Sequence, residues 1–152
     1  MGNVAILALR HAFIARLAEW AFAVIMALWG VVLLMPEKRF ADESWAAFGR
    51  LADETTVGLI CLLLGVARLV VLAANGTWRP MYHLRALTAL WSALIWFAIT
   101  LGFLSAGVMG TWLAVYPVLF AFDVVNMFRA TGDAAAADKA ARAQGAIHGS
   151  SA

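Results

Sequence analysis

The sequence has little charge and few of the residues on which soluble folds and catalytic sites depend. Only 13% of its 152 residues are charged, whereas 64% are hydrophobic; a soluble domain carries roughly 25% charge. One cysteine and three prolines are present, so no intrachain disulfide can form and few prolines can interrupt a helix. This composition excludes an ordinary soluble domain and predicts a membrane protein.

Motifs for catalysis and for nucleic-acid binding are also missing. We find no glycine-rich phosphate loop, no HExxH motif and no Ser/His/Asp set. His11, His83 and His148 lack a second ligand at helical spacing, and Cys61 stands alone. We therefore expect a protein that is not an enzyme, with no catalytic residues, no metal, no cofactor and no nucleic-acid partner.

The apolar residues are gathered into blocks of about 20, the length needed to cross a hydrocarbon core about 30 Å thick. Four such blocks cover approximately residues 16–35, 56–74, 82–104 and 109–128. They predict an all-α, polytopic membrane protein whose four transmembrane helices form a bundle within residues 1–130. Residues 131–152 are rich in alanine and end in glycine and serine, which predicts a partly disordered tail.

The positions of the basic residues predict the orientation of the bundle. An even number of spans puts both termini on one side, and that side would carry Arg10, Arg16, Arg79, Arg85, Arg129, Lys139 and Arg142. The opposite side has only Lys38, Arg39 and Arg50, diluted by acidic residues. Because short loops rich in Lys and Arg stay in the cytoplasm, we expect an N-in, C-in multi-pass protein of the bacterial inner membrane.

The connection between the first two blocks is the longest. From Asp42 onward, Trp45, Phe48 and Leu51 recur at helical spacing, while the charged residues point elsewhere. This pattern predicts a short amphipathic helix lying in the outer interface. Capping the bundle is its simplest role, and docking a partner or perturbing the membrane is the alternative.

Arg68 interrupts an aliphatic run, LLLGVARLVVL, in the middle of the second block. Arginine keeps its charge at any accessible pH, so in a membrane it must face the bundle and find a partner. Arg68 shares a helical face with Gly58, Cys61 and Gly65, which are small enough for close helix packing. Asp123 in the fourth block lies at almost the same distance from the cytoplasmic end, and we expect the two to pair.

Each of the other blocks also has a polar or small face. Together these faces predict an intramembrane charge cluster of Arg16, Glu19, Arg68, Arg85 and Asp123. Three roles remain open. The pairs can fix the helix register, Glu19 or Asp123 can titrate in a path for protons, ions or a small substrate, or the excess positive charge can bind an anionic lipid headgroup.

Two tryptophans, Trp91 and Trp96, fall near the middle of the third block, where no headgroups are available. They predict either indole side chains that fill the bundle with hydrogen bonds or an aromatic wall for a cationic or aromatic ligand.

The second half of the chain resembles small multi-span membrane proteins of tailed bacteriophages and prophages. The resemblance rests on NGTWRP, on the central WF of the third block, and on YPVLFAFDVVNMFRA. Most of that group have no assigned function, and some are holin-like, oligomerising to permeabilise the host inner membrane. The resemblance implies an oligomeric structural or holin-like role, although four spans and a nearly neutral tail depart from a common holin pattern.

Two other classes of function compete. Glu19 in LAEWAFA is similar to the single carboxylate in the first span of small four-span multidrug exporters, which exchange protons for aromatic cations. The nearby arginines would repel such a cation. The third class is an accessory subunit that fills a groove in a larger membrane complex. All three have the lipid bilayer as their surroundings, and copies of the chain or a complex subunit as candidate partners.

Overall fold

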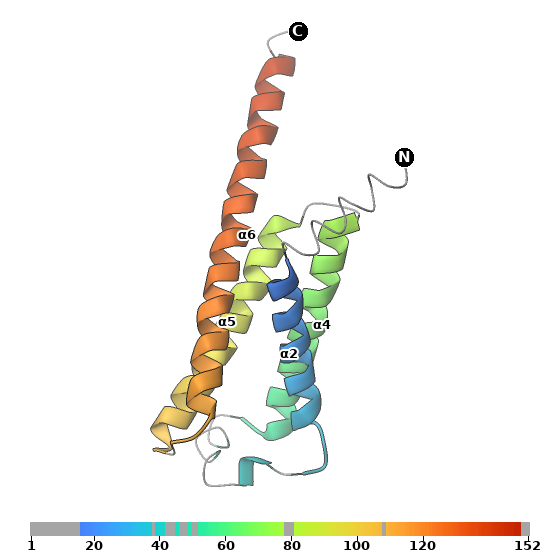
Figure 1. Cartoon of the computed structure of the whole chain (residues 1–152). Coiled ribbons are helices and arrows are strands. Elements are labelled where there is room, and N and C mark those ends of the chain that lie inside the picture. Colours follow the sequence, from blue (N-terminus) through green and yellow to red (C-terminus); the bar gives the residue numbers. More distant parts are fainter. Residues whose placement is uncertain are drawn as a thin grey trace.

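Helices make up every regular element of the described chain. The computed structural model describes residues 16–37, 39–41, 45, 49, 52–77, 81–107 and 109–149. The elements are α2 (Leu17–Leu33), the short 3-10 helix η1 (Arg39–Ala41), α4 (Glu54–Thr77), α5 (Tyr82–Ser105) and α6 (Trp112–Gly149) (Figure 1).

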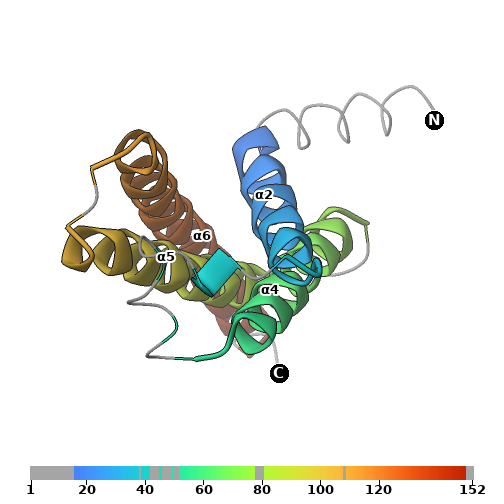
Figure 2. The same cartoon turned by 90° about the horizontal axis from the view of Figure 1, so that it is seen from below.

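The four long helices are arranged as two hairpins. Helix α2 packs mainly on α4, and α5 packs mainly on α6, whereas α2 and α6 touch far less (Figures 1 and 2). We call these the first hairpin (α2–α4) and the second hairpin (α5–α6). Helix α6 projects beyond the others at one end, here called the tail end, where α4 ends and α5 begins (Figure 1). The opposite end is the loop end.

Each of the four long helices covers most of one apolar block of the sequence, which confirms the all-helical fold. Three of them, α4, α5 and α6, are long and apolar enough to cross a membrane. Helix α2 is apolar but has only 17 residues, about 25 Å at 1.5 Å per residue. It ends two residues before the predicted block does. A fourth span and the N-in, C-in orientation therefore remain predictions.

Helix α6 does not end with the fourth apolar block. It contains 38 residues and continues through the alanine-rich segment to Gly149. Alanine has the highest helix propensity of the residues, which explains why the helix extends past Ala130. The division of the chain at residue 130 and the partial disorder of the tail remain predictions.

Glycines allow the two helices of the first hairpin to approach backbone to backbone. A Cβ added at Gly30 would lie 2.7 Å from the carbonyl oxygen of Gly58, and one at Gly65 would lie 2.7 Å from Cα of Ala27. Cys61 is completely buried on the same face. The small-residue face predicted for Arg68 is thus the packing face of α4, and Leu63 and Val70 on the other side are well exposed.

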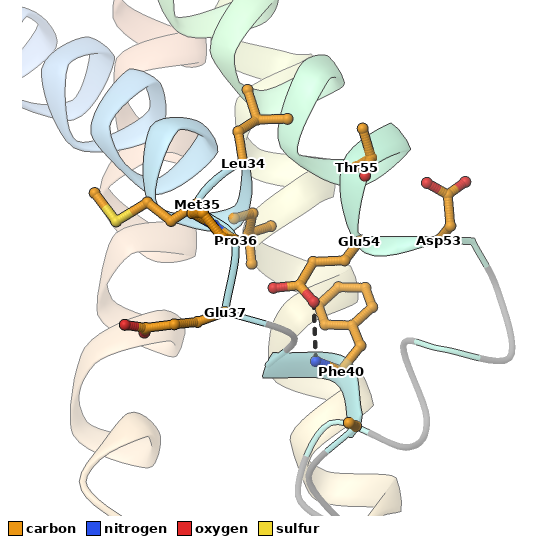
Figure 3. A pocket seen from close by; sticks show the side chains of 10 residues that line it. Leu34, Met35, Pro36, Glu37, Phe40, Asp53, Glu54 and Thr55 are labelled. Atoms are coloured by element: carbon orange, nitrogen blue, oxygen red, sulfur yellow. Dashed lines mark hydrogen bonds between the residues drawn. The ribbon is translucent and has the colours of Figure 1, made fainter.

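The described residues of the connection between α2 and α4 lie at the loop end. The predicted amphipathic helix falls mostly outside the described residues, but Trp45 is described and packs edge-on against Phe103, with ring centroids 4.8 Å apart. Glu54 at the start of α4 accepts a hydrogen bond from the backbone N–H of Arg39 and another from that of Phe40, each at 3.2 Å; Figure 3 shows the second of them. A hollow of about 450 Å³ lies between this turn and the end of α2.

Asp53 caps the first turn of α4. Its carboxylate accepts hydrogen bonds from the backbone N–H of Thr56 at 2.9 Å and from the Thr56 hydroxyl at 2.6 Å. These hydrogen bonds, first that of the hydroxyl, lower the pKa of Asp53 below its ordinary value. The ionised carboxylate satisfies a backbone donor that the helix itself cannot, so the helix start is fixed where the hydrophobic run begins.

Close packing of the first hairpin can be tested at Gly65. Replacing Gly65 with Ala puts a methyl group against the backbone of Ala27, so we expect a loss of about 1–3 kcal/mol in unfolding free energy. The matched control is Gly132→Ala, also within a helix but with nothing near the added methyl; it should be neutral or stabilising by up to about 1 kcal/mol. Unfolding in detergent measures both, and equal stability of the two variants would contradict the packing.

Candidate functional site

Arg68 and Asp123 meet inside the bundle, as their matched depths in the sequence predict. The Nη2 atom of Arg68 lies 2.6 Å from Oδ1 of Asp123, and both side chains are almost completely buried. Asp123 also accepts a short hydrogen bond from the Ser92 hydroxyl and one of 3.3 Å from the Asn126 amide. Helices α4, α5 and α6 thus all supply partners to one carboxylate.

The Arg68 guanidinium is less completely satisfied than the Asp123 carboxylate. Its contact with Asp123 is an ion pair without the alignment of a hydrogen bond, and neither Nη atom has a hydrogen-bond acceptor among the described residues. A buried arginine with spare donors is costly in a low-dielectric interior. The ion pair with Asp123 is therefore the main interaction that stabilises the buried charge of Arg68.

A second buried pair lies toward the tail end. Arg85 on α5 forks onto Glu19 of α2, with Nε at 2.9 Å and Nη2 at 3.0 Å from the two carboxylate oxygens. Its third nitrogen, Nη1, donates to Asp133 of α6 at 3.0 Å. Arg85 and Glu19 are buried, whereas the Asp133 side chain is half exposed. One arginine therefore serves two carboxylates.

The predicted five-residue cluster is divided in the structure. Four of its members form the two pairs. Ser92, which contacts Asp123, lies seven residues after Arg85 on α5, so the two pairs are about two helical turns, or about 10 Å, apart. Arg16, just before α2, is partly exposed and forms no ion pair with another described residue.

Sequence reasoning missed Asp133. It continues the helical stripe of Asp123, Asn126 and Ala130 at the same spacing, so the signal was present. It was overlooked because Asp133 falls after the predicted fourth span, in a segment read as a loose tail. Asp138, one turn farther, lies 3.5 Å from the exposed His83 imidazole.

Both buried ion pairs connect one hairpin to the other. Arg68 of the first hairpin meets Asp123 of the second, and Glu19 of the first meets Arg85 of the second. We call the surface between the hairpins the seam. No ion pair between the two helices of one hairpin is buried on both sides within the described residues.

Toward the loop end the seam is aromatic. Trp96 is fully buried, stacks on Tyr116 at 5.9 Å and meets Trp29 edge-on at 6.0 Å. The indole N–H of Trp29 donates to the Tyr116 hydroxyl at 3.3 Å, whereas that of Trp96 is buried with no partner among the described residues. Trp91 is 54% exposed on the opposite face of α5. The structure therefore does not bring Trp91 and Trp96 together.

The polar groups buried in the seam include two ion pairs between arginine and carboxylate side chains. Each buried carboxylate is in direct contact with an arginine, and no three His, Cys, Asp or Glu side chains of the described chain are grouped as metal ligands. Such an arrangement can hold helices in register, and it can respond to a change that removes one charge of a pair.

No protein-family model matches the chain, and no curated protein or solved structure matches it.

The Arg68–Asp123 pair can be tested by unbalancing it. Asp123→Ala leaves Arg68 buried without a counter-charge, and we expect a loss of about 3–5 kcal/mol in stability and a lower folded yield. Adding Arg68→Leu removes the orphaned charge and should restore part of that yield. The control Asp133→Ala removes a half-exposed partner and should cost about 1 kcal/mol or less. Size-exclusion yield and unfolding in detergent measure all three variants, and normal yield and stability of Asp123→Ala would refute the assignment.

Proposed function

We propose that the chain is a small, non-enzymatic, multi-pass protein of a bacterial inner membrane, of phage origin, that acts through assembly with further copies as a structural or holin-like component. One observation carries the proposal. Every acidic side chain that is buried among the described residues contacts an arginine across the seam. The buried charge is used to join helix pairs, and none of it is left unpaired for acid–base work.

The outer surface of the bundle supports a membrane location. Leu63, Val70 and Trp91, on α4 and α5, and Val125 and Phe128, on α6, are each more than half exposed. In water such a surface would be an aggregation liability, whereas in lipid it costs nothing. Glu19, Arg68, Arg85 and Asp123 are instead buried inside the bundle, which is the arrangement expected when lipid is the solvent.

We take α2 as a fourth span, with both termini in the cytoplasm. A 17-residue helix crosses a bilayer when the membrane thins locally or flanking residues reach to the interface, and Arg16 and Trp20 at its start are suited to that. The basic residues gather at the tail end, where anionic headgroups of the inner leaflet would also find partners.

The assembly role can be tested by inducing the gene in a bacterial host. We expect the membrane to lose its potential at a defined time after induction, with cell lysis when an endolysin is co-expressed. The variant Asp123→Ala should delay or abolish this loss, since it breaks the seam. A membrane-potential dye and culture turbidity provide the readouts. Sustained growth and full potential at high expression would contradict a holin-like role, and a stoichiometric host partner on purification would indicate an accessory subunit.

A second candidate, proton-coupled transport through Glu19, is favoured by the geometry of Arg85. Because Arg85 also contacts Asp133, its charge keeps a partner if Glu19 takes up a proton and releases it. Where a buried carboxylate pairs with an arginine that also contacts a second carboxylate, protonation of the first and the position of the helices can be coupled.

The assembly role and transport make opposite predictions for Glu19→Gln. This variant keeps the size and hydrogen-bonding capacity of the side chain but cannot titrate. We expect it to fold, with stability reduced by the loss of one buried charge, and to leave resistance of the host to quaternary ammonium compounds unchanged. A severalfold loss of resistance relative to the exposed control Glu37→Gln would favour transport instead.

A further inference from the structure

The two hairpins contact each other less than the two helices within each hairpin do. Within each hairpin the helices pack closely, whereas between the hairpins α4 and α5 contact each other less and α2 and α6 least. Helix α4 ends at Thr77 and α5 begins at Tyr82, so only residues 78–81 link the hairpins covalently. Each hairpin is therefore a compact unit, and the seam is a surface that each presents to the other.

The chemistry of the seam is directional. The first hairpin carries the Glu19 carboxylate near the tail end and the Arg68 guanidinium deeper in the bundle. The second hairpin carries the opposite charges at the same two levels, Arg85 near the tail end and Asp123 deeper in. A first hairpin of one copy therefore presents to the second hairpin of another copy the same pairs that it makes within its own chain. Two first hairpins would place like charges together and are excluded.

The connection between the hairpins is short in sequence. Its sequence, WRPM, contains Pro80, and the residue before a proline is disfavoured in helical conformation. Four extended residues reach about 13 Å, and short hinges between exchangeable units favour swapping. Because the ion pairs made between copies equal those lost within the chain, exchange leaves the number of satisfied buried charges unchanged.

From these observations we propose that the partner of the seam is a second copy of this chain: the hairpins exchange, so that Arg68 and Glu19 of one copy pair with Asp123 and Arg85 of the next. This inference rests on the proposed assembly role and names its interface. The contact is head-to-tail, so copies that do not close as a pair continue into rings.

Charge reversal distinguishes pairing of hairpins from two copies from pairing of the two hairpins of one chain. Arg68→Asp places two acids at the seam and Asp123→Arg places two arginines there, so each variant alone should lose at least about tenfold in assembled protein. When the two variants are co-expressed, exchanged copies regain matched pairs at every contact, and the assembled fraction should recover severalfold. The control is one chain that carries both reversals. Recovery by that control but not by co-expression would overturn the exchange.

Crosslinking decides the matter where reversed charges prevent accumulation. Phe22 on α2 and Phe122 on α6 stack across the seam with centroids 5.6 Å apart. In a Cys61→Ala background, Phe22→Cys is placed on one tagged copy and Phe122→Cys on another, and a short flexible thiol crosslinker is added to membranes. Exchange predicts a mixed dimer at several times the level of either single variant. Crosslinks formed only when both cysteines are in one chain would overturn it.

The two proposals fail separately. Mixed dimers without loss of membrane potential would leave the exchange standing and remove the holin-like role. Loss of potential with crosslinks confined to single chains would do the reverse.

Discussion

The cost of removing charge from water is the constraint on which this structure depends. A guanidinium or carboxylate in a low-dielectric interior costs several kcal/mol unless it is paired, and four such groups are buried among the described residues. Their pairing fixes which helix faces meet and at what level. Ser92 and Asn126 contact Asp123 because that carboxylate must be in place to neutralise Arg68. The glycines then set how closely the first hairpin can pack.

The same constraint explains how much of the site could be predicted from sequence. Arg68 and Asp123 were paired by helical phase and depth alone, since an ion in a span has few permitted surroundings. Helical phase also identified Gly58, Cys61 and Gly65 as a packing face. What phase alone could not supply was the choice among several arginines and acids of one cluster. Glu19 pairs with Arg85, and Arg16 takes no part in either buried pair, because the rotation and tilt of each helix determine which side chains reach one another.

Helix ends were predicted less well than helix positions, for a physical reason. Hydrophobicity marks where lipid begins and ends, whereas a helix stops where its backbone bonds or its side-chain contacts stop. Helix α6 therefore continues past the apolar block into alanine-rich sequence, and Asp133 reaches Arg85 from there. At the other extreme, α2 ends at Leu33 although Leu34 and Met35 remain apolar.

Distribution of charge across the seam also bears on what the protein can do. A bundle held together by hydrophobic contact alone has no preferred partner in lipid, because acyl chains satisfy an apolar face equally well. Buried ion pairs are different, since only a complementary charge satisfies them. Among the described residues, the two ion pairs that are buried on both sides lie between the hairpins, which makes each hairpin selective in its partner. Such an interface can be remade between copies without a change in its chemistry, and a membrane protein that acts by assembly requires that property.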